Sequence, residues 1–186
     1  QGVEQNRVRE LAERIIMRLS SLGRALPPQA IDVLEMPRRH VGFGSGTQLG
    51  LAVAAGLLQS QDLPLEGLEQ LMLLAGRGLR SSVGSYGFLH GGLIAEAGKF
   101  PGETLAPLIA QLTLPPAWRL LLVIPRASQG LSGAPEKEAF AKLPPVPEAT
   151  SDRLAAELSL ELIPAARTAD FTRYATSVAR YGELAG

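Results

Sequence analysis

The chain has 186 residues, 46% of them apolar and 19% charged, which is the composition of a folded globular protein long enough for a sizeable core. Its 18 basic and 18 acidic residues give a formal net charge of zero, which argues against the broad nucleic-acid binding that a basic surplus supports. It contains no cysteine, so disulfide bonds, a thiolate nucleophile and cysteine metal ligands are excluded.

The first part of the chain is predicted to alternate between apolar-faced helices and loops. Apolar residues that recur at helical spacing predict the helices, and alternation of apolar and polar residues predicts a strand. In chain order these elements are a helix from Val8 to Leu22, a short strand over residues 31–35, a helix that follows a glycine-rich loop and reaches about Gln59, and a helix over residues 66–75.

The rest of the chain is predicted to contain strands, glycine- and serine-rich loops, and further helices. In order these are a loop over residues 76–87, a strand over 89–97, a strand over 119–125, a loop over 129–133, and helices over 136–143, 150–163 and 171–181. We expect the strand over 119–125 to be central because it is a continuous apolar run. Pro164 is expected to stop the helix before it. The stripe formed by Phe171, Tyr174, Val178 and Tyr181 is expected to be core.

The glycine-rich loop over residues 42–46 is the most informative segment. It runs straight into an apolar helix, and free backbone N–H groups at a helix N-terminus favour an anion. Glycine lets a ligand approach the backbone closely, and Ser45 and Thr47 add hydroxyl donors. The segment is neither a Walker motif nor a dinucleotide fingerprint. It predicts a phosphate-binding loop, and the alternative is a turn that only packs a helix tightly.

Basic residues flank the two glycine-rich loops. Arg38, Arg39 and His40 precede the first loop, and Arg77 and Arg80 lie in the second. Guanidinium groups bind phosphate oxygens in a fork geometry, so these side chains are candidates to complete a site for a polyanion. The alternative is that each is a solvated surface charge.

The histidines and carboxylates are less informative. His40 and His90 are the two histidines, too few for a histidine-rich metal site. His90 precedes two glycines and is a candidate for substrate contact or proton transfer; the alternative is that it bonds only to local backbone. The acidic residues show no paired spacing, so the sequence identifies no ligands for the Mg²⁺ that a phosphate substrate usually requires.

Several motifs occur in a fixed order, and together they carry a resemblance. They are Gly44-Ser45-Gly46-Thr47-Gln48, Gly76-Arg77-Gly78 with Arg80-Ser81, His90-Gly91-Gly92, Trp118-Arg119, and Gly130-Leu131-Ser132-Gly133 followed by Glu138 and Phe140. In this order the chain resembles the GHMP superfamily of small-molecule kinases, and within it the β-ribofuranosylaminobenzene 5′-phosphate synthases. The resemblance runs from about Asp32 to Phe140 and continues more loosely through the last two helices.

The resemblance implies a fold and an organisation. It implies a helix-rich α+β fold of the GHMP-kinase type. Residues 1–115 would form the N-terminal half with its phosphate loop, and residues 116–186 an incomplete, ferredoxin-like C-terminal half. The family's N-terminal strands and its C-terminal strand find no counterpart here, so we expect a shortened version of that fold. From composition alone, residues 143–147 are the best candidate linker.

The resemblance also implies an activity and the residues that perform it. The family condenses phosphoribosyl pyrophosphate with 4-aminobenzoate or 4-hydroxybenzoate and releases pyrophosphate and CO₂, in tetrahydromethanopterin biosynthesis. The implied pyrophosphate-binding residues are Gly42, Gly44, Ser45, Gly46, Thr47, Gln48, Arg77, Ser81 and Ser82, and the implied catalytic residues are Arg80 and His90. Mg²⁺ is expected from the chemistry, and a homodimer is expected from the family.

Two other functions stay open at this point. The first is an ATP-dependent GHMP kinase, although the stretch from Ser81 to Phe88 lacks the acid that those kinases usually present there. The second is a non-catalytic remnant that keeps the fold for binding. Because the longest apolar run is about half a membrane span and no secretory signal is visible, we expect a cytoplasmic protein without a membrane segment.

Overall fold

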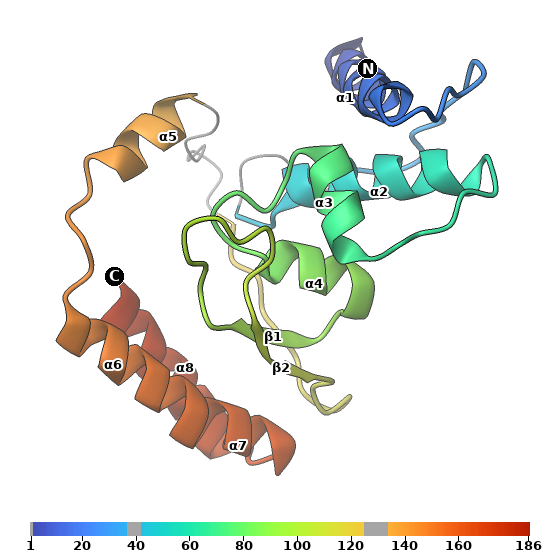
Figure 1. Ribbon diagram of the computed structural model, residues 1–186. Coiled ribbons are helices and arrows are strands. Elements are labelled where there is room, and N and C mark those ends of the chain that lie inside the picture. The colour runs from blue at the N-terminus through green and yellow to red at the C-terminus, as the bar shows by residue number, and fades with distance from the viewer. Residues whose placement is uncertain (1, 37–41, 125–133) are drawn as a thin grey trace. The chain divides into compact units, whose positions relative to one another are not determined.

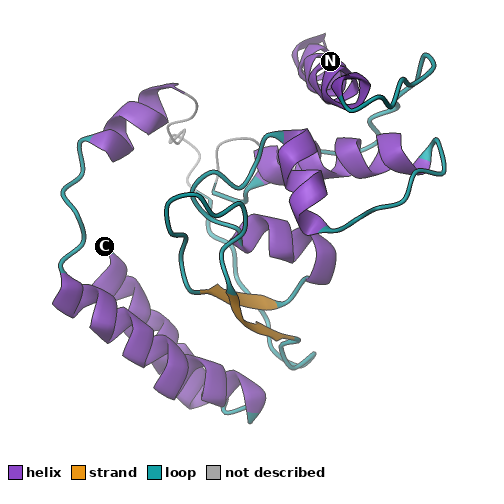
Figure 2. Ribbon diagram, viewed as in Figure 1, coloured by secondary structure: helices purple, strands orange, loops and turns teal. Residues whose placement is uncertain are grey.

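The computed structural model describes residues 2–36, 42–124 and 134–186 (Figure 1). They divide into two compact units. Unit 1 runs to Gly91 and includes Glu96–Pro107; unit 2 consists of Gly92–Ala95 and Leu108–Gly186. Figure 2 shows many helices and a small sheet, which confirms the predicted helix-rich α+β class. The division into halves at residue 115 and the GHMP-type architecture stay predictions.

Unit 1 is built from helices. They are α1 (Gly2–Ser21), α2 (Ser45–Gln59), α3 (Leu68–Ala75) and α4 (Val83–His90). The first three confirm the helices predicted from apolar spacing. Their apolar faces meet in a core whose largest fully buried apolar side chains are Ile15, Leu19, Leu51, Leu58, Leu71 and Met72. Among the described residues no helix is both long and apolar enough to cross a membrane.

Polar contacts fix α1 against the rest of unit 1. Arg18 Nη1 donates to the carbonyl of Leu74 in the last turn of α3, where the exposed carbonyls carry partial negative charge. Further along the chain, Arg24 Nη2 lies 2.7 Å from Glu66 Oε1. Because α1 is held in this way, its polar face has a defined position relative to α2 and α3.

Unit 2 contains the sheet and the remaining helices. Its elements are strands β1 (Leu93–Glu96, whose last residue belongs to unit 1) and β2 (Leu108–Leu112), helices α5 (Ala134–Ala141) and α6 (Glu148–Ala156), the π-helical segment η1 (Glu157–Leu162), and helices α7 (Ile163–Arg167) and α8 (Phe171–Ala185). The strands are antiparallel, because Ala97 N–H donates to Pro107 O at one end while Gly92 lies against Leu112 at the other. Ala95, Ala110 and Ile163 form the small core between sheet and helix.

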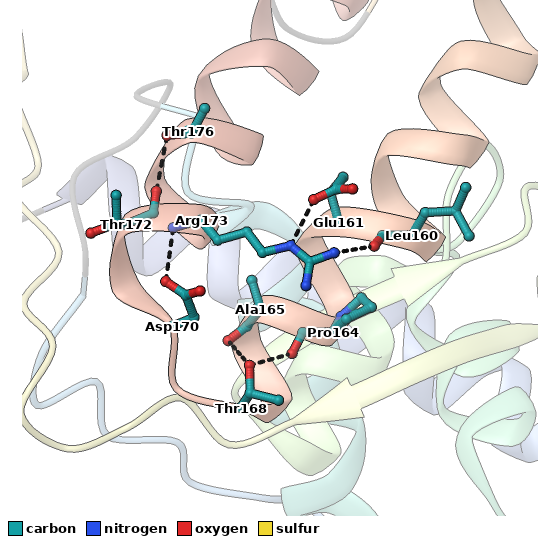
Figure 3. Close-up of polar contacts among 9 residues, drawn as sticks. All are labelled: Leu160, Glu161, Pro164, Ala165, Thr168, Asp170, Thr172, Arg173 and Thr176. Carbon is teal, nitrogen blue, oxygen red and sulfur yellow. Dashed lines mark hydrogen bonds and ion pairs between the residues drawn. The ribbon is translucent and has the colours of Figure 1, made fainter.

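The start of α8 is a well-capped helix end (Figure 3). The Asp170 carboxylate accepts a hydrogen bond from Arg173 N–H at 3.1 Å. The Arg173 side chain in turn donates from Nε to Glu161 Oε2 at 2.7 Å and from Nη2 to Leu160 O at 2.7 Å. The bond from Arg173 lowers the pKa of Glu161 below its ordinary value. These contacts attach α8 to η1.

Two predicted strands are wrong. Residues 31–35 and 119–124 form no strand. In the part of the chain that the structure describes, the sheet consists of β1 paired with β2. A strand needs a neighbour to satisfy its backbone N–H and C=O groups, and neither segment has one among these residues. Their side chains are exposed as a result, with Leu34 at 96% and Leu121 at 89%.

Three further expectations are corrected. Residues 83–90 form helix α4 instead of the end of a loop and the start of a strand. On this helix Tyr86 is buried within unit 1. Pro164 does not stop its helix, since it occupies the first turn of α7, where a missing N–H is tolerated. Phe171 and Val178 of the expected core stripe are exposed, and the rings of Phe171 and Tyr174 contact Trp118.

Candidate anion-binding site

The glycine-rich loop leads into α2 in the way that an anion site needs. Gly42 and Gly44 have φ angles of 83° and 63°, which residues other than glycine rarely adopt. Gly44 O accepts hydrogen bonds from Thr47 N–H at 2.8 Å and Gln48 N–H at 3.1 Å, which begins the helix. No side chain caps this end, and no acidic residue lies in the first turn. The partial positive charge at the start of α2 is therefore not neutralised by the first turn itself.

Two arginines lie against this first turn. The position that a Cβ would take at Gly46 is 3.3 Å from Arg7 Nη2 and 3.6 Å from Arg77 Nη2. Arg77 follows Gly76, the left-handed residue that ends α3, and its N–H donates to Met72 O at 2.9 Å. The structure thus brings the predicted residue Arg77 to the predicted loop.

The surroundings of Arg77 are basic and partly buried. Burial lowers the pKa of its guanidinium, and the nearby positive charges of Arg7 and Arg14 lower the pKa further. Its Nε is buried and has no hydrogen-bond partner among the described residues. A Cβ at Gly50 would lie 3.3 Å from this Nε, so the absence of a side chain there leaves room for the guanidinium. A negative ligand would relieve this concentration of positive charge.

Thr47 and Gln48 join the start of α2 to the start of α4. Gln48 Nε2 donates to Gly84 O at 2.8 Å. The methyl group of Thr47 lies 3.4 Å from the position of a Cβ at Gly84, so a side chain at that position would crowd it. Both side chains therefore position α4, while their backbone N–H groups belong to the first turn of α2.

The start of α4 is occupied by an acid of the chain itself. Ser82 is fully buried, its N–H donates to Glu96 Oε2 at 2.7 Å, and its Oγ accepts from Ala106 N–H at 2.9 Å. The exposed Ser81 accepts a hydrogen bond from Val83 N–H through its Oγ at 3.2 Å. Both serines lie just before Gly84, which contacts Thr47 and Gln48 in the first turn of α2. Ser82, however, is part of the framework, and its assignment to pyrophosphate stays a prediction without structural support.

The loop between α3 and α4 is held by Lys99. The Lys99 Nζ donates to Gly78 O at 2.7 Å and to Thr104 O at 2.9 Å. Arg80 lies in this loop and is exposed. Its predicted catalytic role is neither supported nor opposed by this position.

His90 lies away from the glycine loop. It is the last residue of α4, about 10 Å along the helix axis from Val83. Its exposed ring stacks on Tyr86 with 6.5 Å between ring centroids. The Tyr86 O–H donates to Ala106 O at 2.7 Å, so this hydroxyl is bonded to the backbone, and burial raises the pKa of Tyr86. The role of His90 in proton transfer stays a prediction.

Some predicted features lie outside the described residues. They are Arg38, Arg39 and His40 before the glycine loop, and the motif Gly130-Leu131-Ser132-Gly133. In the described ranges, no group of three His, Asp or Glu side chains could hold a metal ion. Sequence reasoning missed the positions of Arg7 and Glu96. Arg7 belongs to no motif, and Glu96 has no second acid at a spacing that would mark a site. Both residues reach their helix ends through tertiary contacts.

The described residues therefore define a helix-rich α+β chain with a candidate anion-binding site at the start of α2. In sequence, this chain is similar to three archaeal proteins, each named beta-ribofuranosylphenol 5′-phosphate synthase. The protein of Archaeoglobus fulgidus is 32% identical over 166 aligned residues, and the match covers 83% of this chain and 52% of that protein. The protein of Methanothermobacter thermautotrophicus is 30% identical over 151 residues, 75% of this chain and 46% of that protein.

The third relative, from Methanocaldococcus jannaschii, is 27% identical over 149 residues, 73% of this chain and 45% of that protein. These similarities confirm the resemblance to this group of synthases, and the GHMP superfamily stays a prediction. The chain spans about half the length of the curated relatives it matches. No family model matches it.

Proposed function

We propose that this chain takes part in a decarboxylating ribofuranosyl transfer. In this reaction phosphoribosyl pyrophosphate donates its ribose to 4-hydroxybenzoate or 4-aminobenzoate, and pyrophosphate and CO₂ leave. The observation that carries the proposal is the uncapped start of α2 with the guanidinium of Arg77 against it. The similarity to three proteins named as synthases of a ribofuranosylphenol phosphate supports the assignment to this reaction. The protein would then be an enzyme, a pentosyltransferase of tetrahydromethanopterin biosynthesis.

The proposed chemistry balances without an oxidant or reductant. The bond between C1 of the ribose and the pyrophosphate oxygen breaks, and its electron pair leaves with pyrophosphate. The ring carbon that carries the carboxylate forms a new bond to C1. The bond from that carbon to the carboxylate then breaks, CO₂ leaves, and the electron pair restores the aromatic ring. Negative charge thus develops on the leaving pyrophosphate, where preorganised donors lower the barrier.

The residues divide between the leaving group and the acceptor. The backbone N–H groups at the start of α2, other than those of Thr47 and Gln48, which donate to Gly44 O, would bind the pyrophosphate together with the Arg77 guanidinium. Gly42 and Gly44 would give the loop its shape, and Ser45 would add its hydroxyl. Arg80 would hold a phosphate or the aromatic carboxylate, and His90 would hold or move a proton on the acceptor's hydroxyl or amino group.

Two further points belong to the proposal. The relatives' name specifies a phenol product, which favours 4-hydroxybenzoate over 4-aminobenzoate as the acceptor. Mg²⁺ is proposed from the chemistry of pyrophosphate alone; the side chains described do not offer a cluster that fits it, so no residue is assigned to it. A homodimer is likewise proposed from the family resemblance.

Calorimetry followed by a turnover assay tests the proposal. Phosphoribosyl pyrophosphate, pyrophosphate and ATP are titrated separately into the purified chain. Carboxyl-labelled 4-hydroxybenzoate and 4-aminobenzoate are then assayed for pyrophosphate and labelled CO₂. We expect binding of phosphoribosyl pyrophosphate and of pyrophosphate, and in the turnover assay equal amounts of the two products. Binding of ATP alone would support a kinase, and binding of none of the three would support a non-catalytic remnant.

A further inference from the structure

A second arginine, Arg7 of α1, reaches the same place as Arg77. The Cβ position of Gly46 lies 3.3 Å from Arg7 Nη2 and 3.6 Å from Arg77 Nη2, so the two guanidinium groups lie over the same residue. Arg7 is half-buried and comes from a helix that precedes the glycine loop in sequence. Its position depends on the packing of α1 against α2 and α3.

The charged groups that act on Arg77 are of one sign. The groups whose charges act on the pKa of Arg77 are Arg7 and Arg14, and both lower it. Arg14 has an acidic neighbour, Glu10, at 4.0 Å on the exposed face of α1. The first turn of α2 contributes its own partial positive charge and no acidic side chain. Like charges at this spacing repel one another, and a ligand with two or more negative charges reverses the sign of that interaction.

The glycines of α2 make room for the two side chains. A Cβ at Gly46 would meet Arg7 and Arg77, and a Cβ at Gly50 would lie 3.3 Å from Arg77 Nε. Gly56, on the same helix, has no atom within 4 Å of its Cβ position. Glycine is a weaker helix former than alanine, so Gly46 in the first turn of α2 and Gly50 further along lower the stability of the helix where the guanidinium groups lie close.

We propose that Arg7 is a second pyrophosphate-binding residue, which together with Arg77 holds one phosphate group at the start of α2. This inference rests on the proposed function of the glycine loop. Each guanidinium presents parallel N–H donors that match phosphate oxygens, so two of them fix the orientation of the group as well as its position. Because Arg7 belongs to α1, the bound phosphate connects α1 to α2, and ligand binding slows the local opening of α1.

The test is a calorimetric titration of pyrophosphate into the whole chain and its variants. Arg7→Gln is expected to weaken pyrophosphate binding by about tenfold or more, since hydrogen bonds to charged groups are lost. Arg9→Gln is the matched control, because it removes the same charge from an exposed position of the same helix. Its affinity is expected to stay within about twofold of the unaltered chain, since an exposed distant charge is screened by salt. Arg7→Lys keeps the charge without the fork and is expected to lie between.

Hydrogen exchange gives a second readout that a merely structural role would not move. Addition of pyrophosphate should slow the exchange of α1 amides in the unaltered chain and leave their exchange unchanged in Arg7→Gln. If the unaltered chain binds pyrophosphate and Arg7→Gln binds it equally well, the inference is overturned and the proposed function stands. Equal weakening in Arg7→Gln and Arg9→Gln also overturns it, because the effect is then one of overall charge.

Two remaining outcomes are also decisive. If the unaltered chain binds neither pyrophosphate nor phosphoribosyl pyrophosphate, both the inference and the proposed function are overturned. If Arg7→Gln loses its helical circular dichroism, the test is hydrogen exchange of the α1 amides in the unaltered chain. The inference is overturned if pyrophosphate does not slow that exchange.

Discussion

Helix α2 follows Gly44 and has no side-chain cap and no acid in its first turn, whereas α4 follows Ser82, whose N–H donates to Glu96 Oε2. The two ends are adjacent, since Gln48 of the first donates to Gly84 O of the second. Both have the same partial positive charge, because each is the N-terminus of a helix. The start of α4 faces the carboxylate of Glu96, and the start of α2 lies against Arg7 and Arg77.

This difference separates a structural helix end from a candidate binding end. A carboxylate that the chain supplies stabilises the fold and leaves no place for a ligand of the same charge. At the start of α2 no acid lies in the first turn, and burial and nearby arginines lower the pKa of Arg77, so a bound anion would stabilise its charged form. Of the two serine- or glycine-rich loops, we therefore assign the pyrophosphate to the one before α2.

The largest expected effect is at the uncapped end. Arg77→Gln should weaken pyrophosphate binding by about 10- to 100-fold, which corresponds to ~1.5–3 kcal/mol, because it removes charge-assisted hydrogen bonds to the anion. Its melting temperature should stay unchanged or rise, since a buried Nε without a partner is removed. Calorimetry and thermal unfolding measure the two quantities. An unchanged affinity would remove the main support for the site.

The opposite result is expected at the capped end. Glu96→Gln should lower the free energy of unfolding by about 1–2 kcal/mol, because it removes the negative charge that faces Ser82 N–H and the start of α4. Its pyrophosphate affinity should not change. Glu103→Gln is the control, since Glu103 is an acid whose bond to Phe100 N–H is exposed, and its effect should stay within about 0.5 kcal/mol. Tighter pyrophosphate binding by Glu96→Gln would show that α4 also offers an anion site.

A helix end in unit 2 sharpens the comparison, because there the cap is local. Asp170→Ala should lower the free energy of unfolding by about 1 kcal/mol, since the bond from Arg173 N–H at the start of α8 is lost (Figure 3). Asp170→Asn keeps an oxygen acceptor at this position and should retain most of the stability. Urea unfolding followed by circular dichroism measures both variants. Equal destabilisation by Ala and Asn would mean that the charge, and not the cap, stabilises this end.

The smallest effects are expected inside α2. Gly56→Ala should raise the free energy of unfolding by about 0.5–1 kcal/mol without changing pyrophosphate affinity, because its methyl group would meet no atom. Gly46→Ala should gain less stability and bind pyrophosphate more weakly, since its methyl group would displace Arg7 and Arg77. Chemical unfolding and calorimetry on this pair distinguish helix propensity from the space that the site needs. Identical behaviour of the two variants would contradict a role for Gly46.

Sequence patterns predicted the elements whose stability is local. The spacing of apolar residues located α1, α2 and α3, and the glycines before Ser45 located the start of α2. The contact of Ser82 with Glu96 could not be predicted in this way, because the two residues are brought together by the path of the chain between them. Likewise, the position of Arg7 next to Gly46 could not be predicted, because it depends on how α1 packs against α2.

The wrong strand predictions have a physical cause. An apolar run such as residues 120–123 has the composition of a buried strand, and composition does not say whether a neighbouring strand is present. Likewise, Pro164 was expected to end a helix because proline lacks an N–H. Its place in the first turn of α7, after a π-helical segment, makes that N–H unnecessary. The strand errors come from missing neighbouring strands, and the Pro164 error comes from the position of the proline within its helix.

The exposed run Leu120-Leu121-Leu122-Val123 has a practical consequence for work with this chain. It contains no charge, proline or glycine, and such windows of high β-propensity nucleate intermolecular cross-β stacking when they are solvent-accessible. Samples should therefore become turbid with concentration and bind amyloid dyes, independently of any specific dimer. A lysine placed at Leu121 as a gatekeeper should suppress this turbidity, so that the assembly state measured by sedimentation is that of the folded protein.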